Sequence, residues 1–404
     1  MTTVSPGSGT TGADARITRT PSEQAWLRVR GELKRRRFEL ALQAAHDYPP
    51  AARVAGTPLT AAPRWIPAAP LPLEAVAIDL VAIDPVAGVP DGVGQAAVTG
   101  RGPGGEGVRP VDAAGRRYPG YTAAMAVLDR PAVFADLPTY RLHDADLSLP
   151  GGRGALTLGL GSYFDGVDVG EACAHEFVAG PERPLRQAVG EPWDLQRRPV
   201  NLAISTLTIR LDRTAGPGRL GGTAGAAGSA TMLLHRRDPT KVGHAGGLLQ
   251  VVPAGIFQPS GPAEWNLRND FDLWRSITRE YSEELLGTAE EYGSDRQPID
   301  YGAWPFAASL AQARRDGGVR VSVLGLGVDP LTFATDLLTV AVFEAPVFDS
   351  LFAGLVATNA EGSVFAGIPF TERTVERLLR DEPVQAAGAA LVALAWRHRD
   401  VLLS

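Results

Sequence analysis

The chain has 404 residues, of which 45% are hydrophobic, and a formal net charge of −6. This length favours two structured parts plus tails, and the mildly negative charge argues against a dedicated nucleic-acid binder. Cys173 is the single cysteine, which excludes an internal disulfide framework and a cysteine-rich zinc site. The 39 basic residues include only two lysines, and this bias, with 46 glycines and 32 prolines, indicates a GC-rich bacterial genome.

The first 20 residues are rich in Gly, Thr and Ser and are expected to form a disordered tail. They lack the apolar core of a secretory signal. The longest apolar runs, such as AAGAALVALAW near the end, are too short to span a bilayer. We therefore expect a cytoplasmic protein without membrane contact.

Residues 21–50 predict a helix that starts at Pro21 and carries an approximate apolar stripe. The KRRR run at 34–37 is interpreted as a solvated face of this helix, with contact to phosphate or an acidic partner as the alternative. No second helix follows at helix-turn-helix distance, so direct DNA binding is not expected. The Pro- and Ala-rich residues 49–73 predict an extended connector.

Short apolar strings that alternate with turn signals predict the remaining elements. Strands are expected at 76–83, 155–164, 201–211, 230–238, 246–259, 319–328 and 337–345. Helices are expected at 168–180, 269–287, 371–381 and 385–403, and flexible loops at 99–107 and 221–229. This mixture indicates an α/β or α+β layer fold. The expected parts are a tail over 1–20, a helix and connector over 21–72, a β-rich region over 73–198 and a second domain over 199–404.

The segment 269–287 has the strongest helical pattern in the chain. Asn269 or Asp270 is predicted to cap it, and Gly287 stands where a left-handed residue ends a helix. Its apolar residues fall on one side, which should face the core: Phe271, Trp274, Ile277, Tyr281 and Leu285. Its glutamates share a separate stripe: Glu280, Glu283 and Glu284. Like charges at these spacings repel, so the sequence leaves open a solvated face or a bound cation such as Mg²⁺.

The stretch REYSEE resembles the Nudix hydrolase box, whose pattern is Gly, five residues, Glu, seven residues, then Arg-Glu-aliphatic-x-Glu-Glu-x-Gly. The matching residues are Arg279, Glu280, Glu283 and Glu284. ATMLLHRRD resembles the strand before the box, and VVPAG, which ends at Gly255, resembles the Pro-Gly-Gly that opens it. The resemblance covers about residues 200–404. It implies an α+β fold, a Nudix-like αβα sandwich with a mixed sheet, to which the β-rich region adds an N-terminal extension. Residues 21–198 also resemble parts of uncharacterised, regulator-like bacterial proteins.

The sequence departs from the family pattern before the helix. If Gly255 is the box glycine, Arg279 lies 24 positions on (279 − 255), where the family has 14, so the loop is ten residues longer (24 − 14). Counting back from Arg279, Trp265 and Phe271 stand where the family has its glycine and first glutamate. Three acidic residues are candidates for the missing carboxylate: Glu264, Asp270 and Asp272.

The resemblance implies a metal-dependent hydrolase of a nucleoside diphosphate derivative, a nucleotide-derived small molecule. Mg²⁺ or Mn²⁺ would be bound by Glu280, Glu283 and Glu284 and would lower the pKa of a bound water. Glu280 would accept the proton of that water or orient it, and Arg279 would hold a glutamate in place. Substrate contacts are expected from Arg236, Arg237, Gly255 and Trp265, with ordinary surface arginines as the alternative for the first two.

The sequence leaves open an alternative function and the state of assembly. The first is a Nudix-like ligand-sensing or regulatory protein-interaction module without turnover, favoured by the enlarged loop and the missing box glutamate. The second concerns assembly, since a homodimer is compatible with the sequence.

EACAHE has metal-ligand spacing, because Glu171 and His175 are four residues apart. No further histidine lies nearby, so a structural helix face is preferred. Cys173 is interpreted as a small buried residue rather than a thiol nucleophile.

Overall fold

The computed structural model describes residues 19–81, 98–102, 104–214, 229–238, 247–288, 292–359 and 362–404. The predicted tail at 1–20 and the predicted loop at 221–229 lie almost wholly outside the described residues, as does the end of the predicted strand at 76–83. Among the residues described, no helix is both long enough and apolar enough to cross a membrane.

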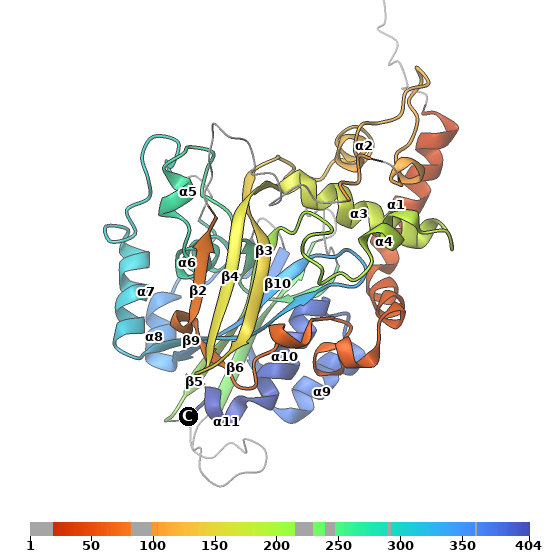
Figure 1. The fold of residues 1–404 in the computed structure, drawn as a ribbon. Helices are drawn as coiled ribbons and strands as arrows, with labels where there is room; N and C mark the ends of the chain where they lie inside the picture. The colour runs from red at the N-terminus through yellow and green to blue at the C-terminus, as the bar shows by residue number, and fades with distance from the viewer. Residues whose placement is uncertain are drawn as a thin grey trace, which may run out of the picture.

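Helices and strands are interspersed along the chain, often in groups of two or more of one kind (Figure 1). The helices are α1 Pro21–Ala44, α2 Tyr121–Leu128, α3 Tyr163–Ala179, α4 Pro184–Val189, α5 Asn266–Asn269, α6 Leu273–Leu286, α7 Pro305–Arg315, α8 Ala345–Leu351, α9 Glu372–Asp381, α10 Ala386–Arg397 and α11 Arg399–Leu402. The strands are β1 Leu71–Pro72, β2 Val76–Leu80, β3 Pro138–Leu149, β4 Arg153–Ser162, β5 Leu202–Asp212, β6 Ser229–Arg237, β7 Leu249–Val251, β8 Ala254–Ile256, β9 Val319–Val328, β10 Thr335–Glu344 and β11 Gly362–Pro369.

The larger sheet, sheet A, has the strand order β1-β9-β10-β5-β6-β11 in the described part of the chain, with β7 paired to β6 and β8 to β5. Strands β10 and β5 run parallel, whereas β9 and β6 run antiparallel to these neighbours. The sheet is therefore mixed, which confirms the predicted α+β class with a mixed sheet.

Helices cover both faces of sheet A. On β5, the Thr208 hydroxyl lies 2.9 Å from the Tyr281 hydroxyl of α6. Three residues earlier, Ser205 accepts a hydrogen bond from Gln250, which also donates to Gln385 at the start of α10. Successive strand residues point to opposite faces, so α6 and α10 lie on opposite sides of the sheet. Burial on both faces explains why β10 is buried along nearly its whole length.

A smaller sheet, sheet B, has the order β2-β4-β3. It joins sheet A through main-chain hydrogen bonds, since the Leu142 N–H donates to the Val200 carbonyl at 2.9 Å. Strand β1 also pairs with β9 inside sheet A. One hydrophobic cluster extends from Trp26 to Leu403 and includes residues on both sides of position 198.

Helix α1 is held against α3 by buried ion pairs. The Arg30 and Arg37 guanidinium groups both bind the Glu171 carboxylate, and all three residues are at most 5% exposed. Lys34 pairs with Asp129. The predicted solvated face is therefore wrong for Arg37, because the run 34–37 spans a full helical turn and one of its members must point inward.

Several element boundaries differ from prediction. The helix expected at 168–180 begins earlier, at Tyr163, where the Asp136 carboxylate accepts the Phe164 N–H at 2.9 Å. The helix expected at 385–403 is interrupted at His398 between α10 and α11. Strands β3 and β11 and helix α7 were not predicted.

Candidate active site

Two local features determine where helix α6 begins and ends. The Asp272 side chain accepts the Arg275 N–H at 2.9 Å and forms the N-cap. Gly287 ends the helix in the left-handed conformation, with φ of +67°, as predicted. The predicted cap at Asn269 or Asp270 is wrong, because Asp270 is fully buried and serves tertiary partners instead.

The apolar side of α6 packs into the core as expected. Ile277, Tyr281 and Leu285 are buried, while Phe271 and Trp274 are partly buried against the same cluster. The Tyr281 hydroxyl has a hydrogen-bond partner in Thr208, which explains how a phenol is accommodated in the core.

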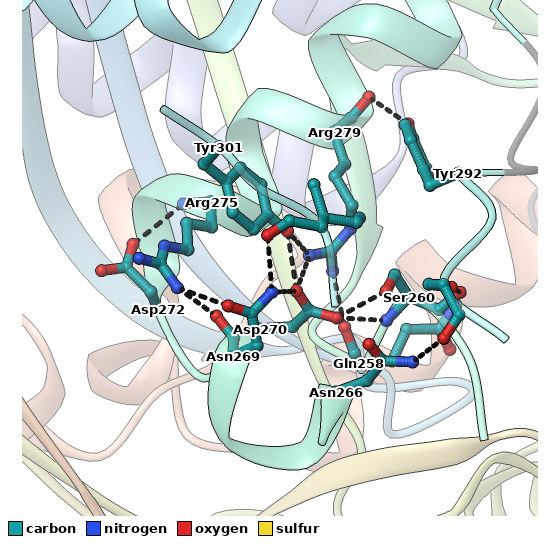
Figure 2. A network of polar contacts seen from close by, with 12 residues as sticks. Gln258, Ser260, Asn266, Asn269, Asp270, Asp272, Arg275, Arg279, Tyr292 and Tyr301 are labelled. Atoms are coloured by element: carbon teal, nitrogen blue, oxygen red, sulfur yellow. Dashed lines mark hydrogen bonds and ion pairs between the residues drawn. The ribbon is translucent and has the colours of Figure 1, made fainter. Parts of the chain in front are cut away.

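Arg279 is buried in a polar network beneath the helix (Figure 2). Its guanidinium donates to the Tyr301 hydroxyl and to the Gln258 carbonyl, each at 2.6 Å, and lies 3.5 Å from the Asp270 carboxylate. Tyr301 in turn donates to Asp270 at 2.8 Å. Burial opposes the charge of Arg279, but Tyr301, Asp270 and Glu280 outweigh that effect and raise its pKa.

Asp270 is thus the carboxylate that faces Arg279. Its second oxygen accepts hydrogen bonds from the Ser260 N–H at 2.8 Å and the Ser260 hydroxyl at 2.6 Å. Of the other two candidates, Glu264 is exposed and Asp272 caps the helix. The loop between β8 and α6 therefore supplies the acidic partner of Arg279.

Two of the three glutamates of α6 face the backbone of β8. Glu284 is 5% exposed, and its carboxylate accepts the Ala254 N–H at 2.7 Å. Glu280 is half-buried against Gly255, since a Cβ atom added to Gly255 would lie 2.0 Å from Glu280 Oε1. One helical turn thus places two carboxylates over a single dipeptide of the sheet.

Glu284 has an imidazole on its other side. Nδ1 of His235, on β6, lies 3.5 Å from Glu284 Oε2, and His235 is 1% exposed. A carboxylate held by a backbone N–H and faced by an imidazole has a fixed orientation.

Glu283 points toward a different segment. The Tyr292 hydroxyl donates to Glu283 at 2.6 Å. Burial raises the pKa of Tyr292, and the charges of Glu283 and Glu280 raise it further, so both carboxylates lie near this phenol. Within the described ranges, no three acidic, histidine or cysteine side chains already converge as a metal-binding group.

The residues expected to bind substrate are spread over several surfaces. Arg236 is largely exposed and lies 3.8 Å from Glu382. Arg237 and His235 are two residues apart on β6, so they lie on the same face of that strand. His235 faces Glu284 of α6, so this face is turned toward α6. Trp265 is 44% exposed, and its indole N–H donates to the Ser294 carbonyl at 3.0 Å.

The EACAHE residues have structural roles, as preferred from the sequence. Glu171 binds two arginines of α1. His175 Nδ1 lies 3.1 Å from the Tyr121 hydroxyl. Glu176 accepts the N–H groups of Leu185 and Arg186. Cys173 is fully buried, and burial raises the pKa of its thiol to about 12, which suits a packing residue.

Three residues of the site were missed from the sequence: His235, Tyr292 and Tyr301. The alternation in ATMLLHRRD places His235 and Leu233 on one face of the strand, a signal that would have found His235. Tyr292 and Tyr301 lie in an irregular segment without periodicity, so no sequence signal places them near α6.

A comparison with protein-family models and with curated proteins found no match to this chain.

Proposed function

We propose that the chain is a divalent-metal-dependent hydrolase of a nucleoside diphosphate derivative, with α6 packed on sheet A in a Nudix-like arrangement. The observation that carries this proposal is the pair Glu280 and Glu284, whose carboxylates face the dipeptide Ala254–Gly255. Arg279 lies on the same turn of the helix, and its guanidinium is 3.5 Å from the buried carboxylate of Asp270.

The donor chemistry of the α6 glutamates supports a magnesium or manganese ion, and Glu283 would have to leave Tyr292 to join Glu280 and Glu284 around it. Glu280, Glu283 and Glu284 supply hard carboxylate oxygens, which these ions prefer. The absence of a side chain at Gly255 lets the Glu280 carboxylate lie close to the backbone of β8, near the carboxylate of Glu284. Glu280, Glu283 and Glu284 would hold the ion. When bound, it would offset the charge of a diphosphate and lower the pKa of a bound water.

Each surrounding side chain then has a distinct task. Glu280 accepts the proton of the attacking water or orients that water. Arg279 is held by Tyr301 and Asp270, and it keeps the turn of α6 that carries the glutamates in position. Arg237, on the sheet face turned toward α6, meets phosphate oxygens. Trp265 offers an exposed ring for a nucleobase.

The test is a panel of nucleotide sugars, dinucleotides and nucleoside diphosphate derivatives incubated with Mg²⁺ or Mn²⁺. We expect release of phosphate-bearing products that falls by at least about 100-fold in Glu280→Gln and is also lost in Glu283→Gln. Glu39→Gln, which alters an exposed glutamate paired with Arg36 on α1, is the matched control and should retain activity. Turnover that survives both glutamate substitutions would contradict the proposal.

A second candidate is a ligand-sensing or protein-interaction module without turnover. The observation that favours it is that two of the three carboxylates already have protein donors: Glu283 accepts from Tyr292, and Glu284 accepts from Ala254. This candidate predicts no product from any compound of the panel, together with a ligand-dependent rise in melting temperature.

A further inference from the structure

We propose that Tyr140, on β3 of sheet B, is a positioning residue of the candidate site and acts through the enlarged loop that carries Asp270. The inference rests on the proposed function, and it assigns a role in the site to the N-terminal part of the chain.

Tyr140 holds the enlarged loop at two places. Its hydroxyl lies 3.1 Å from the Leu267 carbonyl and 3.4 Å from the Asn266 carbonyl, in α5. Its backbone N–H donates to the Phe257 carbonyl at 3.1 Å, where the loop leaves β8. Tyr140 thus ties the beginning of the loop to a point near its end.

The ring of Tyr140 is enclosed by the same loop. Its centroid lies 4.5 Å from that of Phe257 and 5.0 Å from that of Phe271, and Tyr140 is fully buried. Burial raises the pKa of Tyr140, and the nearby charge of Asp270 raises it further, so the phenol keeps its proton and remains a donor.

The turn that Tyr140 contacts leads directly to Asp270. The Asn266 carbonyl, one of the two that face the Tyr140 hydroxyl, accepts the Asp270 N–H at 2.9 Å. Asp270 then binds Tyr301 and faces Arg279, the residue next to Glu280 (Figure 2). Sheet B is therefore linked to the glutamate turn of α6 through one phenol and one helical turn.

The hydroxyl group of Tyr140, and not only its aromatic ring, makes this connection. Tyr140→Phe keeps the aromatic packing but removes the one hydroxyl proton that is donated to the Leu267 carbonyl or shared with the Asn266 carbonyl, which should loosen α5 and the backbone at Asp270. A displacement of Asp270 would shift Arg279 and weaken the geometry of the carboxylates, which affects the chemical step more than substrate binding.

The experiment compares Tyr140→Phe with wild type by amide hydrogen exchange and by steady-state kinetics in Mn²⁺. We expect exchange in residues 258–271 to accelerate about two- to tenfold, with other segments unchanged. We also expect kcat to fall while KM stays nearly constant. Tyr48→Phe is the matched control, because Tyr48 packs against Trp193, outside the loop, and it should change neither quantity.

Unchanged exchange in 258–271 would overturn the inference, and so would acceleration spread evenly over the whole chain, which marks a general loss of stability. The exchange result is independent of turnover. If the wild-type protein hydrolyses no compound of the panel, the proposed function fails, while local acceleration in Tyr140→Phe with an unchanged core would still support the link from Tyr140 to Asp270.

Discussion

Gly255 provides the space in which the Glu280 carboxylate lies, and any side chain at this position would occupy it. Because an added Cβ would lie 2.0 Å from Glu280 Oε1, Gly255→Ala should displace that carboxylate. We expect Mn²⁺ affinity, measured by titration calorimetry, to fall about tenfold or more, as expected when a ligand is displaced.

Gly354→Ala is the control for this substitution, because nothing lies within 4 Å of a Cβ atom added there. It should bind Mn²⁺ as the wild type does. Equal Mn²⁺ affinity in Gly255→Ala and wild type would show that Glu280 is not a ligand.

His175 gives the fold a dependence on pH. Burial, with a contribution from Arg30, lowers the pKa of His175 from 6.5 to about 3. The unfolded chain therefore binds the extra proton first, and stability is lost as the pH falls from about 6.5 toward about 3. His175→Gln keeps an acceptor for Tyr121 and should lose about 1–2 kcal/mol less stability than wild type between pH 7 and pH 5.

Urea unfolding at these two pH values measures this difference. Parallel loss of stability in wild type and His175→Gln would show that another group controls the acid sensitivity.

At the scale of the element, the loop before α6 contains two aspartates with different roles. Asp270→Asn removes the buried negative charge beside Arg279 and should lower the free energy of unfolding by about 2–4 kcal/mol. Asp272→Asn keeps a side chain that caps helices well, so it should cost less than about 0.5 kcal/mol. Denaturant unfolding of both variants measures the difference, and equal losses would contradict the assignment of Asp270 to Arg279.

The sequence predicted much of α6 because its signals are local. Hydrophobic periodicity identified the buried side, and Gly287 identified the end. The N-cap was wrong because Asn269, Asp270 and Asp272 are equally good caps in isolation. Tertiary contacts with Ser260 and Tyr301 occupy the Asp270 carboxylate, and these contacts explain why Asp270 does not cap the helix. Spacing alone likewise left Glu264, Asp270 and Asp272 as equal candidates for the missing box carboxylate, and the contact of Asp270 with Arg279 depends on tertiary structure.

At the scale of the whole molecule, the buried ion pairs between α1 and α3 fix the N-terminal helix to the rest of the protein. Burial opposes the charge of Arg30, yet Glu171 and its neighbours outweigh it and raise the pKa of Arg30. Glu171→Gln leaves two buried guanidinium groups without their shared anion and should cost about 3–5 kcal/mol. Glu39→Gln, which alters an exposed ion pair with Arg36, should cost far less than Glu171→Gln.

Urea unfolding of the two glutamine variants tests this contrast. A loss in Glu171→Gln as small as that in Glu39→Gln would show that the buried network does not stabilise the fold.

The fold class could be predicted from the sequence because alternation of strands and helices is a local signal that survives in most elements. The joining of sheet B to the candidate site could not, since Tyr140 and the 266–267 turn are more than 120 residues apart. The closeness of Glu280 to Gly255 was not predicted, because nothing in local spacing brings a strand to a helix across the loop between β8 and α6.

The proposed function requires a divalent ion held by the carboxylates of α6 beside Ala254–Gly255. Crystals soaked in Mn²⁺ with a non-hydrolysable nucleoside diphosphate analogue, measured for anomalous scattering at the manganese edge, test this claim most directly. We expect a manganese peak about 2 Å from carboxylate oxygens of Glu280 and Glu284. Bound analogue without manganese at these carboxylates, or manganese only elsewhere on the surface, would contradict it.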